Sequence, residues 1–320
     1  MLIPFLQALY HLHLPLPRTD EDYKLLLEEI ELFVLSTQVQ HLLKAAGRYE
    51  ETPVWFQDKL KQRTAQASYH NMFMKHKEEE LLALFEQHAK PVIPLKGVRF
   101  AERYFGHFTA RVTSDIDLLV PADDLKQTIS LVETLGYEFE IVKDHHARLQ
   151  KKDGLMVELH WTLDKLQWSE LSSDPFWQGA EKLEDYQYVK QLSTLHTFYF
   201  MCLHGARHQM DSVRYVLDLA QMLYRCEDEL NLDEVMAISR RDKTSRRVQA
   251  VLSIVYAQFP QLKLRRALPF EHLETHWDYQ MIKNARLGIR SNKYYRYKLF
   301  FRHFIFDTLK HQVKSVRKAY

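Results

Sequence analysis

The chain has 320 residues, 46% of them hydrophobic and 27% charged, so its composition is that of a globular protein with enough apolar residues for a core. Its eight glycines all lie at least nine positions apart, which excludes a Walker A loop and a dinucleotide-binding glycine motif. Its two cysteines are too few for a disulfide framework or a Cys-rich zinc site, and no apolar run reaches the ~18 residues of a membrane-spanning helix. We therefore expect a cytoplasmic protein without a signal peptide or a transmembrane segment.

The net charge of +2 is unevenly distributed along the chain. Residues 281–320 contain eleven Lys or Arg and one acid, whereas the other 280 residues contain 33 basic and 41 acidic residues. The basic character is therefore a local property of the C-terminal segment, not of the whole protein.

Residues 1–90 are predicted to be helical. Apolar residues recur three and four positions apart in residues 22–34 and 75–88, and Thr52-Pro53 breaks the helical pattern between them. This region contains no residue pattern typical of a catalytic site.

Residues 91–163 have a different pattern, which predicts a mixed sheet with helices on one side. Short apolar runs indicate strands, amphipathic runs indicate helices, and Asp153-Gly154 favours a hairpin turn. The expected strands are 92–95, 116–120, 137–142, 146–151 and 155–161, and the expected helices are 98–105 and 122–135.

From residue 164 the pattern is helical again, most clearly in residues 193–225 and 233–259. Gly205 lies inside the first of these segments, where glycine costs about 1 kcal/mol relative to alanine, and a close contact there would explain its presence. We therefore predict an α+β fold, in which a small mixed-sheet core of residues 91–163 is flanked by helical regions 1–90 and 164–320.

Paired acids on one predicted strand are the first candidate for chemistry. Asp115 and Asp117 alternate with apolar residues, so their side chains should point to the same face of the sheet. Two adjacent carboxylates need a counter-cation, and Mg²⁺ prefers such oxygen ligands. Glu158 lies between apolar residues on a later strand, and if the two strands are neighbours it would join the pair in a two-metal site.

Other interpretations of the same acids stay open at this point. An Asp-x-Asp pair can lie on the solvent face of a strand without any catalytic role. The same pair also marks metal sites of glycosyltransferases that use sugar nucleotides, and Glu158 alone would mean little.

Several short motifs, two of which contain these acids, follow one another along the chain. They are Leu95-Lys96-Gly97, Arg111, Ser114-Asp115-Ile116-Asp117-Leu118-Leu119-Val120, His145-His146, Val157-Glu158-Leu159-His160-Trp161, His204-Gly205, His208 and Asp218-Leu219-Ala220.

This succession of motifs resembles the uncharacterised bacterial nucleotidyltransferase-like family of the polymerase-β-type superfamily, over roughly residues 20–250. The resemblance implies that Asp115 and Asp117 bind metal. It implies that Glu158 binds one metal and helps to deprotonate an acceptor hydroxyl. Gly97 would open the first helix near the triphosphate, although Gly97-Val98 stands where the superfamily usually has Gly-Ser or Gly-Gly.

Phosphate contacts are expected from the residues around these acids. Lys96 and Arg111 are the nearest cations, and Gly97 and Ser114 complete the expected nucleotide-binding set. The candidates for the acceptor side are His145, His146, His160, His204 and His208.

The C-terminal segment interleaves basic residues with aromatic ones, from Arg290 through Phe304. Such a pattern can bind nucleic acid or an anionic membrane surface. Because the rest of the chain is acidic, we favour docking of this basic tail, residues 281–320, on the protein's own body. An anionic partner is the alternative, with nucleic acid not favoured.

The resulting functional hypothesis is a nucleotidyltransferase that uses two Mg²⁺ ions, or Mn²⁺ in their place. It would move a nucleoside monophosphate from an NTP such as ATP to a hydroxyl of a small molecule, peptide or protein. The alternatives are a metal-dependent transferase with a nucleotide-sugar donor, and a catalytically weak nucleotide- or partner-binding module of the toxin–antitoxin type.

Overall fold

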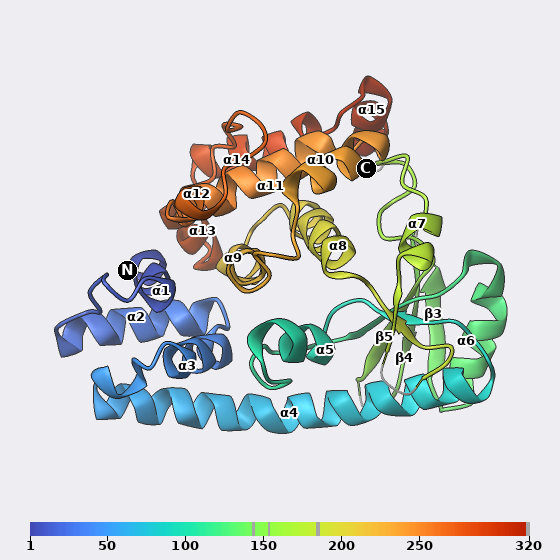
Figure 1. The fold of residues 1–320 in the computed structure, drawn as a ribbon, viewed down its shortest axis with the longest axis horizontal. Helices are drawn as coiled ribbons and strands as arrows, with labels where there is room; N and C mark the ends of the chain where they lie inside the picture. The colour runs from blue at the N-terminus through green and yellow to red at the C-terminus, as the bar shows by residue number, and fades with distance from the viewer. Residues whose placement is uncertain (143–144, 153, 184–185, 318–320) are drawn as a thin grey trace.

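The computed structural model describes residues 1–142, 145–152, 154–183 and 186–317. Four helices begin the chain, and the last of them, α4, runs along the bottom of the molecule in Figure 1 from the N-terminal helices to the sheet. These helices are α1 (Leu2–Tyr10), α2 (Asp20–Leu32), α3 (Ser36–Ala45) and α4 (Val54–Gln87).

Local signals explain where these helices begin. The Thr19 hydroxyl accepts a hydrogen bond from the Asp22 amide and caps α2, whose first turn carries three acids that favour a helix N-terminus. Pro53 precedes the first residue of α4, as the predicted break at Thr52-Pro53 requires. The 34 residues of α4 form one uninterrupted helix.

The mixed sheet has five strands in the order β1-β2-β5-β4-β3, which confirms the predicted fold class. The central pair β2 and β5 is parallel, and the other neighbours are antiparallel. Asp153, in the predicted turn between β4 and β5, lies outside the described residues. The strands are β1 (Ile93–Pro94), β2 (Ile116–Leu119), β3 (Glu138–Val142), β4 (His146–Gln150) and β5 (Met156–His160).

The remaining part of the chain is mainly helical. A short two-stranded sheet, β6 (Glu181–Lys182) with β7 (Lys190–Gln191), precedes the C-terminal helices. The helices after β1 are α5 (Val98–Phe100), which continues as a π-helical turn (Ala101–Phe105), α6 (Leu125–Glu133), α7 (Asp174–Gln178), α8 (Thr194–Arg207), α9 (Val213–Arg225), α10 (Leu232–Arg241), α11 (Ser245–Gln258), α12 (Leu262–Arg265), α13 (Tyr279–Arg286), α14 (Asn292–Leu299) and α15 (Leu309–Arg317).

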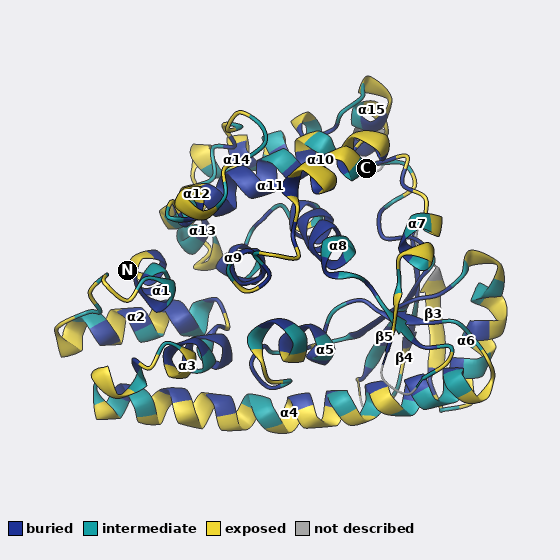
Figure 2. Cartoon of the chain, viewed as in Figure 1, coloured by how far each residue is buried: buried dark blue, intermediate teal, exposed yellow. Residues whose placement is uncertain are grey.

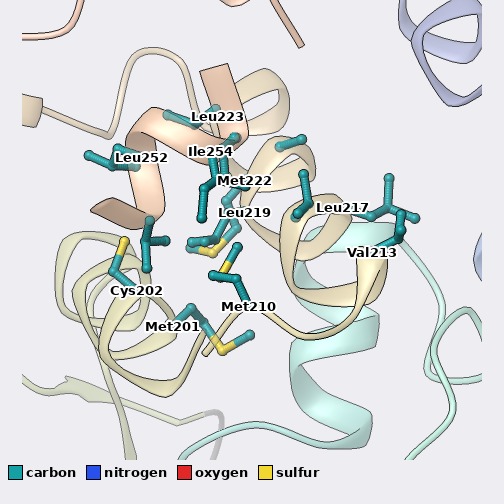
Figure 3. Close-up of a cluster of buried hydrophobic side chains, with 14 of the residues drawn as sticks. Met201, Cys202, Met210, Val213, Leu217, Leu219, Met222, Leu223, Leu252 and Ile254 are labelled. Carbon is teal, nitrogen blue, oxygen red and sulfur yellow. The ribbon is translucent and has the colours of Figure 1, made fainter. Parts of the chain in front are cut away.

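Each of the two long segments predicted after residue 164 forms a pair of helices. The chain reverses between α8 and α9, where Gln209 and Met210 have positive φ. A Cβ on Gly205 would lie 2.7 Å from the Met210 sulfur, so the glycine allows the returning chain to pack against α8. Figure 3 shows Met210 among the buried side chains between these helices.

Two hydrophobic clusters form the core, and α4 contributes to both. Phe56 packs in a cluster with the N-terminal helices and with α8 to α11, whereas Phe85 packs in the cluster under the sheet. Figure 2 shows that α8, α9 and α11 are mostly buried. Apolar contacts thus cross the sequence boundaries at 90 and 163, and the division into three regions stays a prediction.

The basic tail docks on the body of the protein. Tyr297, Phe301 and Ile305 are buried in the larger cluster. Lys283 lies 2.7 Å from the Glu29 carboxylate, and Lys298 lies 3.6 Å from that of Asp211. No helix in the described ranges is sufficiently long and apolar to cross a membrane.

The packing of α4 against the sheet gives a stability prediction. Replacing Phe85, which is fully buried, by alanine should lower the free energy of unfolding by about 3–5 kcal/mol through lost burial and a cavity. Phe73→Ala on the same helix is the matched control because Phe73 is 41% exposed, and it should change stability by less than about 1 kcal/mol. Chemical denaturation measures both, and equal losses would contradict this packing.

Candidate active site

The central strands of the sheet bring two of the predicted acids together. Asp117 on β2 is directly opposite Glu158 on the parallel strand β5, so both side chains lie on the same face. A carboxylate oxygen from each of them and a ring nitrogen of His160 lie within 4.8 Å of one another. Asp115, which was predicted on the same strand, lies two residues before Asp117 and immediately precedes the first residue of β2.

Lys96 connects the two acids of β2. It follows β1, which pairs with β2, and its ammonium nitrogen lies 2.7 Å from Asp117 Oδ2 and 3.3 Å from Asp115 Oδ2. Burial alone would lower the pKa of Lys96, but Asp117 and Asp115 outweigh that effect and raise it. Lys96 is therefore held as a cation between the two carboxylates.

His160 contacts two of the acids, Asp117 and Glu158. Its Nε2 atom lies 3.1 Å from Asp117 Oδ1 and 3.4 Å from Glu158 Oε2. Burial lowers the pKa of His160, yet the hydrogen bonds to the two carboxylates raise it overall. Burial would raise the pKa of Asp117, but Lys96 and His160 hold it well below its usual range.

Two further predicted histidines extend this cluster toward α8. His146 Nε2 lies 3.4 Å from Glu158 Oε1, and His146 Nδ1 lies 3.2 Å from His145 Nε2. The guanidinium of Arg207, at the end of α8, lies 2.7 Å from the same His145 nitrogen. Burial and Arg207 lower the pKa of His145, so this imidazole is neutral and accepts the hydrogen bond from Arg207.

A cavity of about 230 Å³ opens beside Asp115. Its lining includes seven of the predicted residues but not Asp117, Glu158, His145, His146 or His160, which form the adjacent buried cluster. The predicted residues that line the cavity are Lys96, Gly97, Arg111, Ser114, Asp115, His204 and His208. Burial lowers the pKa of His204, and that of His208 to about 4, so both imidazoles in this wall are neutral near pH 7.

Arg111 is bound inside the protein as well as lining this cavity. Its Nε and Nη2 atoms lie 2.9–3.0 Å from the buried Asp218 carboxylate on α9. Gln38 Nε2 donates a further hydrogen bond, of 3.0 Å, to the same carboxylate. The ion pair therefore fixes α9 against the segment before β2, in addition to placing a cation at the cavity wall.

Arg214 and Arg286 are cavity cations that the sequence did not reveal. Arg214 donates a hydrogen bond to the Val112 carbonyl, and burial lowers its pKa to about 10. Arg214 lies four residues before Asp218 on α9, so both side chains are on the same side of this helix. The sequence could not identify Arg214 as a site residue, because no local pattern shows which helix faces the sheet. Phe33 and Tyr215 supply aromatic surface in the same wall.

Gly97 makes the turn that brings Lys96 and α5 together. Its φ of +81° lies in the left-handed region, and an added Cβ would lie 3.3 Å from Thr113 Cγ2 and 3.9 Å from Glu78 Oε1. Glu78 comes from α4 and pairs with Arg99 at 3.0 Å. The glycine therefore packs beside the contact between Glu78 and Arg99, which belongs to the scaffold.

The buried Glu78 gives a pH prediction. Burial raises its pKa from 4.5 to about 7, so between these values the folded state retains a proton that the unfolded chain loses. Its contribution to stability should fall as the pH rises through this window. The free energy of unfolding of Glu78→Gln should therefore rise relative to that of the wild type by about 1.4 kcal/mol per pH unit in this window. Chemical denaturation of both proteins from pH 4.5 to 7 measures this difference.

Asp58→Asn is the matched control for this experiment, since Asp58 is exposed on the same helix and lies 20 positions before Glu78. This variant should stay within about 0.5 kcal/mol of the wild type over the same pH range. Parallel stability curves for wild type and Glu78→Gln would show that Glu78 ionises normally.

One family of known proteins matches most of the chain. The model of a family described as uncharacterised nucleotidyltransferases matches residues 20–260, which include the acids and helices α8 to α11. No curated protein matches the chain. Among solved structures, the crystal structure of ANT(2″)-Ia in complex with adenylyl-2″-tobramycin has 13% identity and a TM-score of 0.36, and covers 51% of this chain and 92% of its own. A solution structure of the antibiotic-resistance factor ANT(2″)-Ia has 14% identity and a TM-score of 0.35, and covers 56% of this chain and 91% of its own.

The family match spans three quarters of the chain and confirms the resemblance found from the motifs. The chain belongs to this uncharacterised nucleotidyltransferase family and is an enzyme of the nucleotidyltransferase class.

Proposed function

We propose that the protein transfers a nucleoside monophosphate from an NTP to a hydroxyl acceptor in a Mg²⁺-dependent reaction. The observation that carries this proposal is the register of Asp117 opposite Glu158 beside a cation-lined cavity. A pair of acids, of which Asp117 is buried and Glu158 is partly buried, next to a basic pocket suits a divalent cation and a triphosphate together.

The side chains present fit a divalent cation. Asp117 and Glu158 offer oxygen ligands within 4.8 Å of each other, and Asp115 adds a third carboxylate beside Lys96. Asp115, Asp117 and Glu158 would hold two Mg²⁺ ions, with Mn²⁺ as the alternative metal. Bound there, the ions would polarise the α-phosphate and neutralise charge on the leaving pyrophosphate.

The protein's own residues then orient and deprotonate the reactants. Glu158 accepts the proton of the acceptor hydroxyl, whose oxygen forms a bond to the α-phosphorus as the bond to the pyrophosphate oxygen breaks. His160 keeps the Asp117 and Glu158 carboxylates in place through its two contacts.

The nucleotide would enter through the cavity beside Asp115. Lys96, Arg111, Arg214 and Arg286 line it, and their charges suit a triphosphate. With a divalent cation held by Asp115 and Asp117, Lys96 would be free to exchange its contacts to these acids for contacts to phosphate. Phe33 and Tyr215 offer aromatic faces for the base.

Nucleotide binding tests this function directly. Calorimetry with each NTP and with UDP-glucose should show binding of at least one NTP that depends on Mg²⁺. Asp117→Asn should abolish this dependence and lower transfer by roughly 10³-fold or more, because a metal ligand is lost. Asp123→Asn, an exposed acid near β2, is the control and should match the wild type.

The other outcomes of this experiment contradict the proposal. Binding of UDP-glucose alone would favour a nucleotide-sugar donor. Absence of binding by all the nucleotides would favour a catalytically weak module.

The pairing of Lys96 with the acids gives a second prediction. Lys96→Met removes a cation that competes with metal for Asp115 and Asp117. Without nucleotide, the variant should bind Mn²⁺ roughly tenfold more tightly than the wild type by electron paramagnetic resonance. Its affinity for NTP should fall, because a phosphate contact is lost. Unchanged metal affinity would mean that Lys96 and the metal use separate sites.

A further inference from the structure

A second cavity, of about 380 Å³, lies at the last turn of α8 and is bounded by the C-terminal segment. Its volume is within the range of pockets that hold small organic molecules. Its lining includes four cationic and two aromatic side chains, those of Lys165, Trp168, Arg207, Arg247, Arg302 and Phe306.

Positive charge predominates in this second cavity. Four cations line it, and its lining includes no carboxylate among the described residues. The Asp164 carboxylate, which is not part of the lining, forms an ion pair of 2.7 Å with the Arg247 guanidinium, and both of these residues are buried.

Arg207 makes no direct ion pair. Its guanidinium contacts the neutral His145 ring and the Leu163 carbonyl, and within the described ranges no carboxylate lies at ion-pairing distance. The Asp164, Asp117 and Glu158 carboxylates attract its charge only from farther away. Arg302 is exposed at the same cavity. An anion bound here would supply a direct counter-charge.

The same cavity also offers flat apolar surface. Lys165 Nζ lies 4.2 Å from the centre of the Trp168 ring, and the Arg247 guanidinium lies 5.6 Å from the centre of the Phe306 ring. Aromatic rings beside cations suit a molecule that combines a planar or apolar body with an acidic group.

Arg207 links this cavity to the proposed reaction centre. The continuous series of contacts runs from Arg207 to His145 at 2.7 Å, on to His146 at 3.2 Å, and then to Glu158 at 3.4 Å. His204 on α8 and His208, which directly follows this helix, line the first cavity and not the second. The end of α8 therefore separates the proposed nucleotide cavity from the second one, and Arg207 connects the second cavity to the acidic cluster through His145 and His146.

We propose that the second cavity binds the acceptor, and that the acceptor is an organic anion with an apolar body whose carboxylate or phosphate contacts Arg207. This inference rests on the proposed nucleotidyl transfer and specifies its acceptor class. A polycationic acceptor would instead meet four positive side chains with no carboxylate among the described residues that line the cavity.

Calorimetry with three small phenols on the full chain tests this inference. The probes are 4-hydroxybenzoate, 4-hydroxyphenyl phosphate and the neutral 4-hydroxybenzyl alcohol, each titrated with Mg²⁺ and a non-hydrolysable NTP analogue present. At least one anionic probe should bind about tenfold or more tightly than the neutral one, since a charged hydrogen-bonding partner is gained. The stronger of the two anions identifies carboxylate or phosphate as the preferred group.

Variants locate the binding. Arg207→Met should abolish the preference for the anion, and Arg207→Lys should retain part of it. Arg302 is exposed, so Arg302→Gln should not disturb folding. This variant should weaken binding of the anionic probe about threefold and leave binding of the neutral probe unchanged. Arg240→Gln removes an exposed charge from α10, outside this cavity, and should have no effect.

The failures of the two proposals are distinguishable. If the NTP analogue binds with Mg²⁺ but neither anion is preferred, the acceptor site is wrong and the transferase proposal stands. The same conclusion follows if the preference survives in Arg207→Met, or if Arg302→Gln leaves it undiminished. If the anion binds at Arg207 but no NTP binds, the cavity is an anion site without an acceptor role, and this inference is overturned together with the proposed function.

Discussion

The buried carboxylate of Asp117 is the constraint around which the structure is organised. An ionised acid in the interior is costly unless cations and hydrogen-bond donors compensate it. Here Lys96 approaches from the end of β1 and His160 from the end of β5, with 2.7 and 3.1 Å contacts to the two carboxylate oxygens. The sheet order, with β2 between β1 and β5, is what allows both neighbours to reach the same side chain.

The helices around the sheet preserve this arrangement and give access to it. Arg111 and Asp218 join the approach to β2 with α9, and Glu78 with Arg99 supports the turn at Gly97 from α4. The end of α8 then separates two cavities that are both lined by cations, one beside Asp115 and one connected to the acids through Arg207, His145 and His146.

Much of this could be predicted from sequence because the signals are local. Alternation of acids with apolar residues placed Asp117 on a strand, and the motif order indicated the family. Asp115, predicted on the same strand, immediately precedes it. Local patterns could not show that Lys96 is bound by the acids, or that Arg111 is held by a residue more than a hundred positions later. The Lys96 contacts depend on the pairing of β1 with β2. The Arg111 contact depends on how α9 packs, and the reversal at Met210, where residues 193–225 become two helices, likewise depends on helix packing.

The most direct test of the account is a crystal structure of the full chain with Mn²⁺ and a non-hydrolysable NTP analogue, with anomalous data recorded to locate manganese. The account predicts manganese between the Asp117 and Glu158 carboxylates, the triphosphate in the cavity beside Asp115, and the Lys96 ammonium on phosphate instead of on Asp117. Nucleotide bound elsewhere, with Lys96 still paired to both acids and no manganese beside Asp117, would contradict it.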